Sequence, residues 1–183
     1  NRYAEKYDIN HDDIMNKNRA YELLFESYQH IGGGDHQSFS KCIEQSSNLL
    51  DNHPSPYYAV GNYYFNQNEY VLAEATFEQG IEKRRSYNDD FNFPVEDESL
   101  YLMWLAMACI PQGKYEKAAE VLEGLIAERV NLSAEQESLI YKCLSLSHKA
   151  LGEKRKADFC RQEAERLDED KKTKAEPCRA FSA

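Results

Sequence analysis

The side chains that most often do chemistry in proteins are all present in this sequence, but their spacing does not predict a reaction. The five histidines show no paired spacing of the kind that holds a metal ion; they are His11, His30, His36, His53 and His148. The glycine run at residues 32–34 follows a helical pattern rather than a strand, so it does not predict a phosphate-binding loop. We therefore expect no catalysis, no cofactor and no metal ion, and predict that the protein is not an enzyme.

Two short segments match binding motifs only in part. Residues 8–12, DINHD, resemble the start of a calcium-binding loop. The sixth position of that loop is Asp13 instead of glycine, and the twelfth is Arg19 instead of glutamate. The triplet NLS at residues 131–133 matches a glycosylation acceptor, but a role as a helix cap explains Ser133 better.

The five cysteines are better explained as reduced core residues than as a disulfide framework. No two of them form a CxxC pair, and their number is odd; they are Cys42, Cys109, Cys143, Cys160 and Cys178. The first four lie among apolar or small residues within helical patterns, where a thiol serves as a small apolar group. This favours a cytoplasmic location. The chain starts at Asn1 without a methionine, so an excised domain or a matured exported chain is the alternative.

The charge balance argues against a nucleic-acid surface. The chain has 32 acidic and 22 basic residues, a net charge of −10, whereas nucleic-acid binding requires clustered lysine and arginine. No run of 18 apolar residues is present, so we expect no membrane insertion. Residues 86–98 carry five acids and no base, and Tyr87, Phe91 and Phe93 are interleaved with them. We expect this acidic insert to be a solvated loop whose aromatic rings pack on neighbouring helices; a flap or docking segment is the alternative.

Apolar residues recur at helical spacing along most of the chain, and β-type alternation is missing, which predicts an all-α protein. Asp12 or Asp13 can cap the first helix and Ser55 the third, with Pro56 in its first turn. Ser133 and Gln136 predict a capping box. Eight helices in four antiparallel pairs are expected, at residues 12–31, 35–50, 55–66, 68–85, 97–110, 114–129, 133–151 and from 154 to beyond 167.

A pattern of small and bulky residues repeats from one helical pair to the next. Ala118 lies three residues after Tyr115 and four before Leu122, and Tyr70, Ala73 and Phe77 repeat this spacing. A third copy centres on Ala157. Two helices approach closely only where side chains are small, so we expect such contacts at residues that recur in both helices of each pair. These are Ser27, Gly61, Ala106 and Ser145 in the first helices, and Ala73, Ala118 and Ala157 in the second.

This pattern resembles the tetratricopeptide repeat, most closely at Tyr57, Val60, Gly61, Tyr64, Ala73 and Phe77. Arg161 departs from it, because that position is usually bulky and apolar. The resemblance implies stacked antiparallel helical hairpins that form a right-handed α-solenoid. We expect a lead-in at residues 1–14, a repeat domain at 15–174 that contains the acidic insert at 86–98, and a tail at 175–183.

The same resemblance implies that the first helix of each pair lines a concave face where partners bind. The residues expected there are Tyr58, Asn62, Phe65 and Asn66, then Met103, Met107 and Ile110, then Lys142, Leu146 and Lys149, with Leu24, Tyr28 and Ile31 assigned less securely. Methionine adapts to apolar partners, and the amide of Asn62 can hold a peptide backbone. The alternative is that some of these side chains pack against a following helix. Repeats of this family that clamp a C-terminal carboxylate use lysine, asparagine and arginine side chains in their first helices. Here only Asn62 fits that pattern, whereas Tyr58, Trp104 and Cys143 stand at other clamp positions, so we do not expect such a clamp.

The function predicted from the sequence is protein–protein interaction without catalysis. The protein would be a module or scaffold that binds a protein or peptide, held as a segment or helix in the concave groove. Two alternatives stay open: a small acidic chaperone of the secretion type that shields an apolar segment of a client, and a helical domain that regulates a larger enzyme. The sequence predicts neither the partner nor the oligomeric state.

Overall fold

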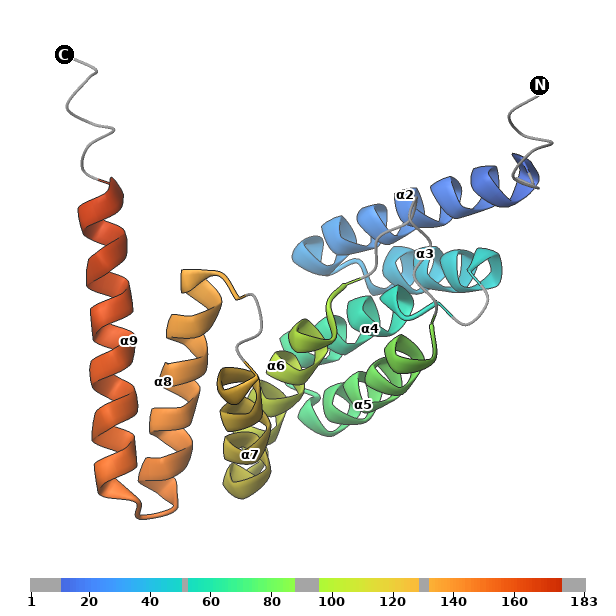
Figure 1. Cartoon of the computed structure of the whole chain (residues 1–183). Coiled ribbons are helices and arrows are strands. Elements are labelled where there is room, and N and C mark those ends of the chain that lie inside the picture. Colours follow the sequence, from blue (N-terminus) through green and yellow to red (C-terminus); the bar gives the residue numbers. More distant parts are fainter. Residues whose placement is uncertain (1–10, 51–52, 88–95, 129–131, 176–183) are drawn as a thin grey trace. The chain divides into compact units, whose positions relative to one another are not determined.

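The computed structural model describes residues 11–50, 53–87, 96–128 and 132–175, and all regular structure in these residues is helical. The helices are α2 (His11–Gly33), α3 (His36–Leu49), α4 (Ser55–Asn66), α5 (Tyr70–Ser86), α6 (Glu98–Cys109), a 3₁₀ turn (Ile110–Gln112), α7 (Tyr115–Ala127), α8 (Ala134–Ala150) and α9 (Lys154–Ala175) (Figure 1). The prediction of an all-α chain of helical hairpins is confirmed.

The turns between the helices follow from local chemistry. Gly34 ends the glycine run in the left-handed region, at φ 72°, which reverses the chain between α2 and α3. The carboxylate of Asp35 then accepts the backbone N–H of Ser38 at 3.0 Å and caps α3. The capping box of α8 is confirmed: Ser133 N–H donates to Gln136 Oε1 at 2.7 Å, and Gln136 N–H donates to Ser133 Oγ at 3.3 Å.

The predicted cap of α4 is wrong. Pro54 holds the cap position and Ser55 is the first residue of the helix, so the Ser55 side chain makes no cap bond. Its hydroxyl donates instead to Glu96 Oε2, 41 residues away, at 2.5 Å. A long-range acceptor therefore replaces the local one that the sequence pattern predicts.

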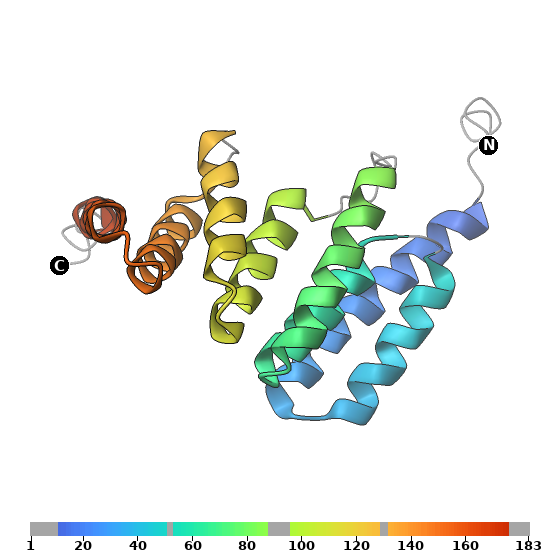
Figure 2. The same ribbon diagram turned by 90° about the horizontal axis from the view of Figure 1, so that it is seen from below.

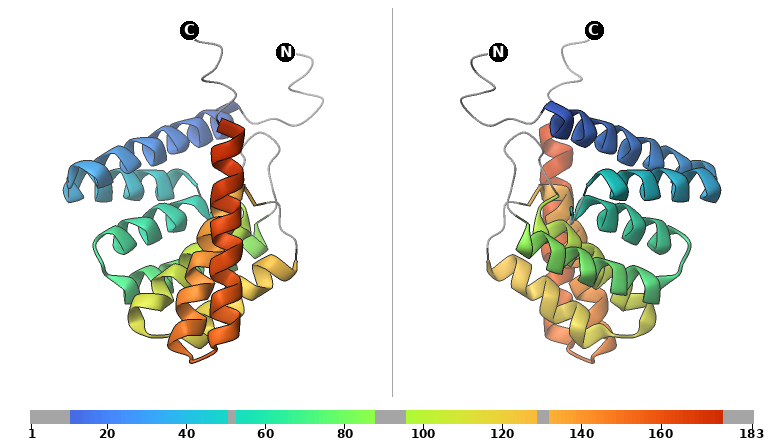
Figure 3. Two further views of the ribbon diagram at one scale, coloured as in Figure 1. Left: turned by 90° about the vertical axis from the view of Figure 1, so that its left-hand side faces the viewer. Right: turned by 90° about the vertical axis from the view of Figure 1, so that its right-hand side faces the viewer.

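The chain divides into two compact units, Asn1–Tyr101 and Leu102–Ala183. In the first unit α2 packs against α3 and α4 against α5, and the two hairpins are joined by contacts of α4 with α2 and α3 (Figure 2). In the second unit α8 contacts α7 and pairs along its length with α9 (Figure 3). The insert predicted at 86–98 is shorter than expected, since α5 includes Ser86 and α6 starts at Glu98. Phe91 and Phe93 lie outside the described residues.

Small residues mark the close approaches between helices, as the repeat pattern predicts. A Cβ atom built on Gly61 of α4 would lie 2.5 Å from Cε1 of Phe77 in α5, which is itself fully buried. Ala73, Ala118 and Ala157 are all buried. The hydroxyl of Ser145 in α8 donates to the carbonyl oxygen of Ala157 in α9 at 2.9 Å, so a small polar side chain can also serve at such a contact.

Candidate functional site

Three tyrosines from α2, α4 and α6 gather around one carboxylate in the first unit. The rings of Tyr58 and Tyr101 meet edge to face, with their centroids 5.2 Å apart. The hydroxyl of Tyr101 donates to Glu96 Oε2 at 3.4 Å, next to the 2.5 Å bond from Ser55. Tyr101 is fully buried, whereas Tyr28 keeps 37% of its surface exposed. We call Tyr28, Tyr58, Glu96 and Tyr101 the tyrosine–glutamate cluster.

The charges in this cluster influence one another. Burial raises the pKa of Tyr28 well above its ordinary value, and the charges of Glu96 and of Tyr58 raise it further. Burial also raises the pKa of Tyr101, again with a contribution from Glu96. The phenols of Tyr28 and Tyr101 therefore stay protonated at neutral pH and can act as hydrogen-bond donors.

The first unit thus brings together Tyr28 and Tyr58, two of the residues predicted from the repeat pattern, but it uses Asn62 differently. The side-chain amide of Asn62 donates to the carbonyl oxygen of Tyr58, in its own helix, at 2.8 Å. This bond competes with the predicted use of the amide to hold a partner's backbone. Leu24 is buried in a core cluster with Ala20 and is not a surface residue.

The other predicted residues of this unit show graded exposure. Phe65 is half-buried and meets the ring of Tyr70 edge to face, with centroids 5.5 Å apart. Asn66 is exposed and Ile31 is half-buried. None of these three belongs to the tyrosine–glutamate cluster as the described contacts define it.

A buried histidine supports the start of α4 beside this cluster. His53 Nδ1 accepts the backbone N–H of Ser55 at 3.3 Å, and His53 Nε2 lies 3.0 Å from the hydroxyl oxygen of Tyr21. Burial, assisted by the charges of Lys17 and Arg84, lowers the pKa of His53 from 6.5 to about 4. The ring is therefore neutral at pH 7, and since Nδ1 is an acceptor, its proton sits on Nε2. We interpret this histidine as a structural group that holds the start of α4 against Tyr21 of α2.

In the second unit a groove runs between α8 and α9. It consists of two hollows of about 460 and 340 Å³ that share Ser145, Leu146 and Arg161 as lining residues. Leu146 is 57% exposed, which is unusual for a large apolar side chain at the edge of a hollow. Two more predicted residues line it, Lys142 in the smaller hollow and Lys149 in the larger one. The structure thus brings together all three residues predicted for α8.

The charges along this α8–α9 groove are uneven. The larger hollow is lined by the cations Lys149, Lys154 and Arg161 and by the single acid Asp158. Asp158 pairs with Arg161 at 3.0 Å. Lys142 pairs with Asp168 of α9 at 2.7 Å, between two largely solvated side chains. One end of the groove is therefore basic, in a chain whose net charge is −10.

Arg161 lines both hollows of the groove but was not selected for binding by the repeat pattern. The signal that could have found it was its departure from the pattern, because a charged residue stands where a bulky apolar one is usual. The structure is consistent with the departure, since Arg161 is exposed and lines both hollows.

The residues predicted in α6 are less accessible than expected. Met103 is only 5% exposed, so it is a core residue and offers little surface to a partner. Met107 and Ile110 are half-buried. Helical spacing places these residues near one face, but the degree to which neighbouring helices cover that face is a tertiary property.

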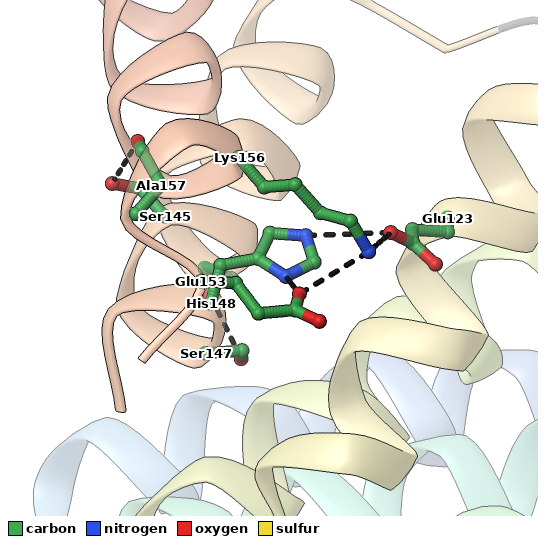
Figure 4. Close-up of polar contacts among 8 residues, drawn as sticks. Glu123, Ser145, Ser147, His148, Glu153, Lys156 and Ala157 are labelled. Atoms are coloured by element: carbon green, nitrogen blue, oxygen red, sulfur yellow. Dashed lines mark hydrogen bonds and ion pairs between the residues drawn. The ribbon is translucent and has the colours of Figure 1, made fainter. Parts of the chain in front are cut away.

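A second buried histidine joins three helices of the second unit. His148 is 2% exposed and lies between two carboxylates: its Nδ1 is 2.8 Å from Glu153 Oε2, and its Nε2 is 3.4 Å from Glu123 Oε1 (Figure 4). Lys156 reaches the same two carboxylates at 3.2 and 3.6 Å. The hydrogen bonds from Lys156 and His148 lower the pKa of Glu153. This network connects α7, α8 and the start of α9.

A thiol shares a hollow with the histidine network. Cys160 lines a hollow of about 230 Å³ together with His148 and Glu123. Burial raises the pKa of Cys160, and the charge of Glu123 raises it further, so the thiolate that acts as a nucleophile is disfavoured. We interpret the network as a structural connection between helices.

The described part of the chain contains neither a metal-ligand cluster nor a membrane-spanning helix. Within it, no group of three or more histidine, cysteine, aspartate or glutamate side chains is arranged to hold a metal ion. No helix within the same residues has the length and apolar character needed to cross a membrane.

No protein-family model matches this chain, and no curated protein matches it. The resemblance to tetratricopeptide repeats therefore depends on the residue pattern quoted above.

Proposed function

We propose that the protein is a non-catalytic interaction module of tetratricopeptide type that binds a peptide or a helix of a partner protein. The observation that supports this most directly is the α8–α9 groove. There an exposed leucine, Leu146, stands between two hollows, with Lys149 and Arg161 beside it.

The groove has the two components that peptide recognition requires. An apolar side chain of the partner that covers Leu146 removes apolar surface from water, at about 25 cal/mol per Å². Charged residues at the edge of the contact then select the partner and orient it. The ion pair of Lys142 with Asp168 is solvated, so its exchange for a partner's acid costs at most about 1 kcal/mol.

These properties define the kind of partner. A segment with one apolar anchor and one or more acidic side chains near it fits the basic end of the groove. Lys149 is the best candidate for the charge contact, because it lines the larger hollow, is exposed, and makes no ion pair within the described residues.

The proposal can be tested with the full chain immobilised and a matched pair of variants. Leu146→Asp should reduce capture of partner proteins strongly, while Val71→Asp, at a 66% exposed residue of α5, should not. Both substitutions lie on exposed helical positions, so the change in unfolding free energy should stay within about 0.5 kcal/mol for each.

Proteins identified by mass spectrometry would then be purified and measured by calorimetry against the parent and both variants. Lys149→Glu should weaken binding of an acidic partner and reduce its dependence on salt. If Leu146→Asp captures the same proteins as the parent with the same affinity, the groove is not the binding surface. A partner that precipitates unless this protein is present would favour the chaperone among the functions weighed from the sequence.

A further inference from the structure

We propose that the tyrosine–glutamate cluster of the first unit is a subsite for a cationic side chain, lysine or arginine, of a partner chain. The proposal concerns a different surface from the α8–α9 groove and depends on different observations. It also differs in chemistry, since the groove is basic at one end whereas this subsite is acidic and aromatic.

The carboxylate of Glu96 is held in place by two neutral donors. Ser55 donates to its Oε2 at 2.5 Å and Tyr101 at 3.4 Å, and neither hydroxyl cancels the negative charge. Arg84 reaches the same residue, but its Nε donates to the backbone carbonyl oxygen of Glu96, at 3.1 Å. Within the described part of the chain, no ion pair reaches the Glu96 carboxylate. Its charge is therefore held in position on a half-buried side chain without a compensating cation among the described residues.

The surroundings of the carboxylate are aromatic. Tyr101 forms a fully buried wall, Tyr58 is half-buried against it, and Tyr28 is partly exposed at 37%. A cation over the face of a tyrosine ring is attracted by the ring quadrupole, and this attraction strengthens as water is removed. The raised pKa values of Tyr28 and Tyr101 keep these phenols uncharged, so Glu96 is the source of negative charge in the cluster.

Other ligand classes fit this arrangement less well. An anion would meet the fixed charge of Glu96 and be repelled. A purely apolar group would cover a half-buried carboxylate without supplying a hydrogen bond, which is costly. A lysine or arginine side chain supplies the donor, the positive charge and an apolar stem that can lie along the rings. The net charge of −10 adds a long-range attraction for a basic segment.

The subsite can be tested with small probes, before a partner is known. The full chain would be labelled with ¹³C in its tyrosine rings and titrated with Nα-acetyl-arginine amide and Nα-acetyl-lysine amide. Nα-acetyl-norleucine amide, of similar length but uncharged, is the matched control probe. Tyr28→Phe and Tyr58→Phe assign the two signals. We expect saturable shifts of both signals with the cationic probes, and none with the norleucine probe.

A pair of charge variants then distinguishes binding at the subsite from attraction of the probes by the net negative charge of the chain. Glu96→Gln keeps an oxygen acceptor for Ser55 and Tyr101 but removes the charge, so it should weaken binding of both cations about tenfold. Glu98→Gln, two residues away in a pair with Arg85 at 2.6 Å, should leave binding unchanged. Circular dichroism would confirm that both variants remain folded.

Three results would overturn the proposal: equal shifts with the norleucine probe, equal binding by Glu96→Gln and the parent, or no saturable shift with either cation. The test is independent of the α8–α9 groove, because Leu146→Asp should bind the cationic probes as the parent does. Loss of peptide binding in that variant and loss of cation binding in Glu96→Gln therefore report on separate proposals.

Discussion

A single methyl group placed at Gly61 tests how the helices of the first unit pack. Glycine in the middle of a helix normally costs roughly 0.5–1 kcal/mol relative to alanine, so Gly→Ala is expected to stabilise an unobstructed helix. At Gly61 the added Cβ would lie 2.5, 2.7 and 2.8 Å from three ring atoms of Phe77. Phe77 is fully buried, so its ring cannot swing into solvent to make room.

The expected magnitude follows from the two opposing effects. Overpacking of this kind costs about 1–3 kcal/mol, which outweighs the gain in helix propensity. Gly61→Ala should therefore lower the unfolding free energy by up to about 2.5 kcal/mol. At Gly124, in α7, a Cβ atom would meet no atom within 4 Å apart from its chain neighbours and the backbone of its own helix, so Gly124→Ala should raise stability by roughly 0.5–1 kcal/mol.

The assay is urea unfolding followed by circular dichroism, with each unit's transition analysed separately if two are seen. Phe77→Leu in the Gly61→Ala background should recover part of the loss, because it removes the ring that the methyl group contacts. A double-mutant cycle measures that coupling. If Gly61→Ala stabilises the protein as much as Gly124→Ala does, α4 and α5 do not approach closely at Gly61. A small residue would then not be required at that position of the repeat.

Three further predictions concern buried groups. The pKa of His53 is lowered from 6.5 to about 4 in the folded protein, so the folded state favours the neutral ring. As the pH falls from 6.5 to 4, the unfolding free energy should therefore decrease by up to roughly 3 kcal/mol. Urea unfolding across this pH range measures the decrease, and a His53→Gln variant with the same pH dependence would contradict the prediction. Met103→Glu should lower the unfolding free energy by several kcal/mol, on the order of the cost of a buried charge. Met107→Glu should lower it clearly less, because Met107 is half-buried. Equal melting temperatures for the two variants would contradict this difference in burial. Burial raises the pKa of Cys143 to about 11, so this thiol should react with a disulfide reagent only after unfolding, and rapid labelling in native buffer would show that it is accessible.

The sequence by itself determines the helices and much of their pairing. Helix limits depend on local features, namely apolar spacing, caps and glycine, and these act within a few residues of one another. The Ser133–Gln136 box and the stop at Gly34 are therefore found where the pattern predicts them. Close contacts at Gly61 and Ala157 are also predictable, because a repeating small residue has a steric reason that does not depend on the rest of the fold.

Only the tertiary structure decides which side chains remain available to a partner. Met103 and Lys142 hold the same position in the repeat, yet Met103 is buried and Lys142 is exposed, because burial depends on which helices pack against each position. Glu96 lies in a segment predicted as a solvated loop, but its carboxylate accepts a bond from Ser55, 41 residues away. Hydrogen bonds and burial between distant segments leave no local periodicity in the sequence, and for that reason the tyrosine–glutamate cluster emerges only from the folded chain.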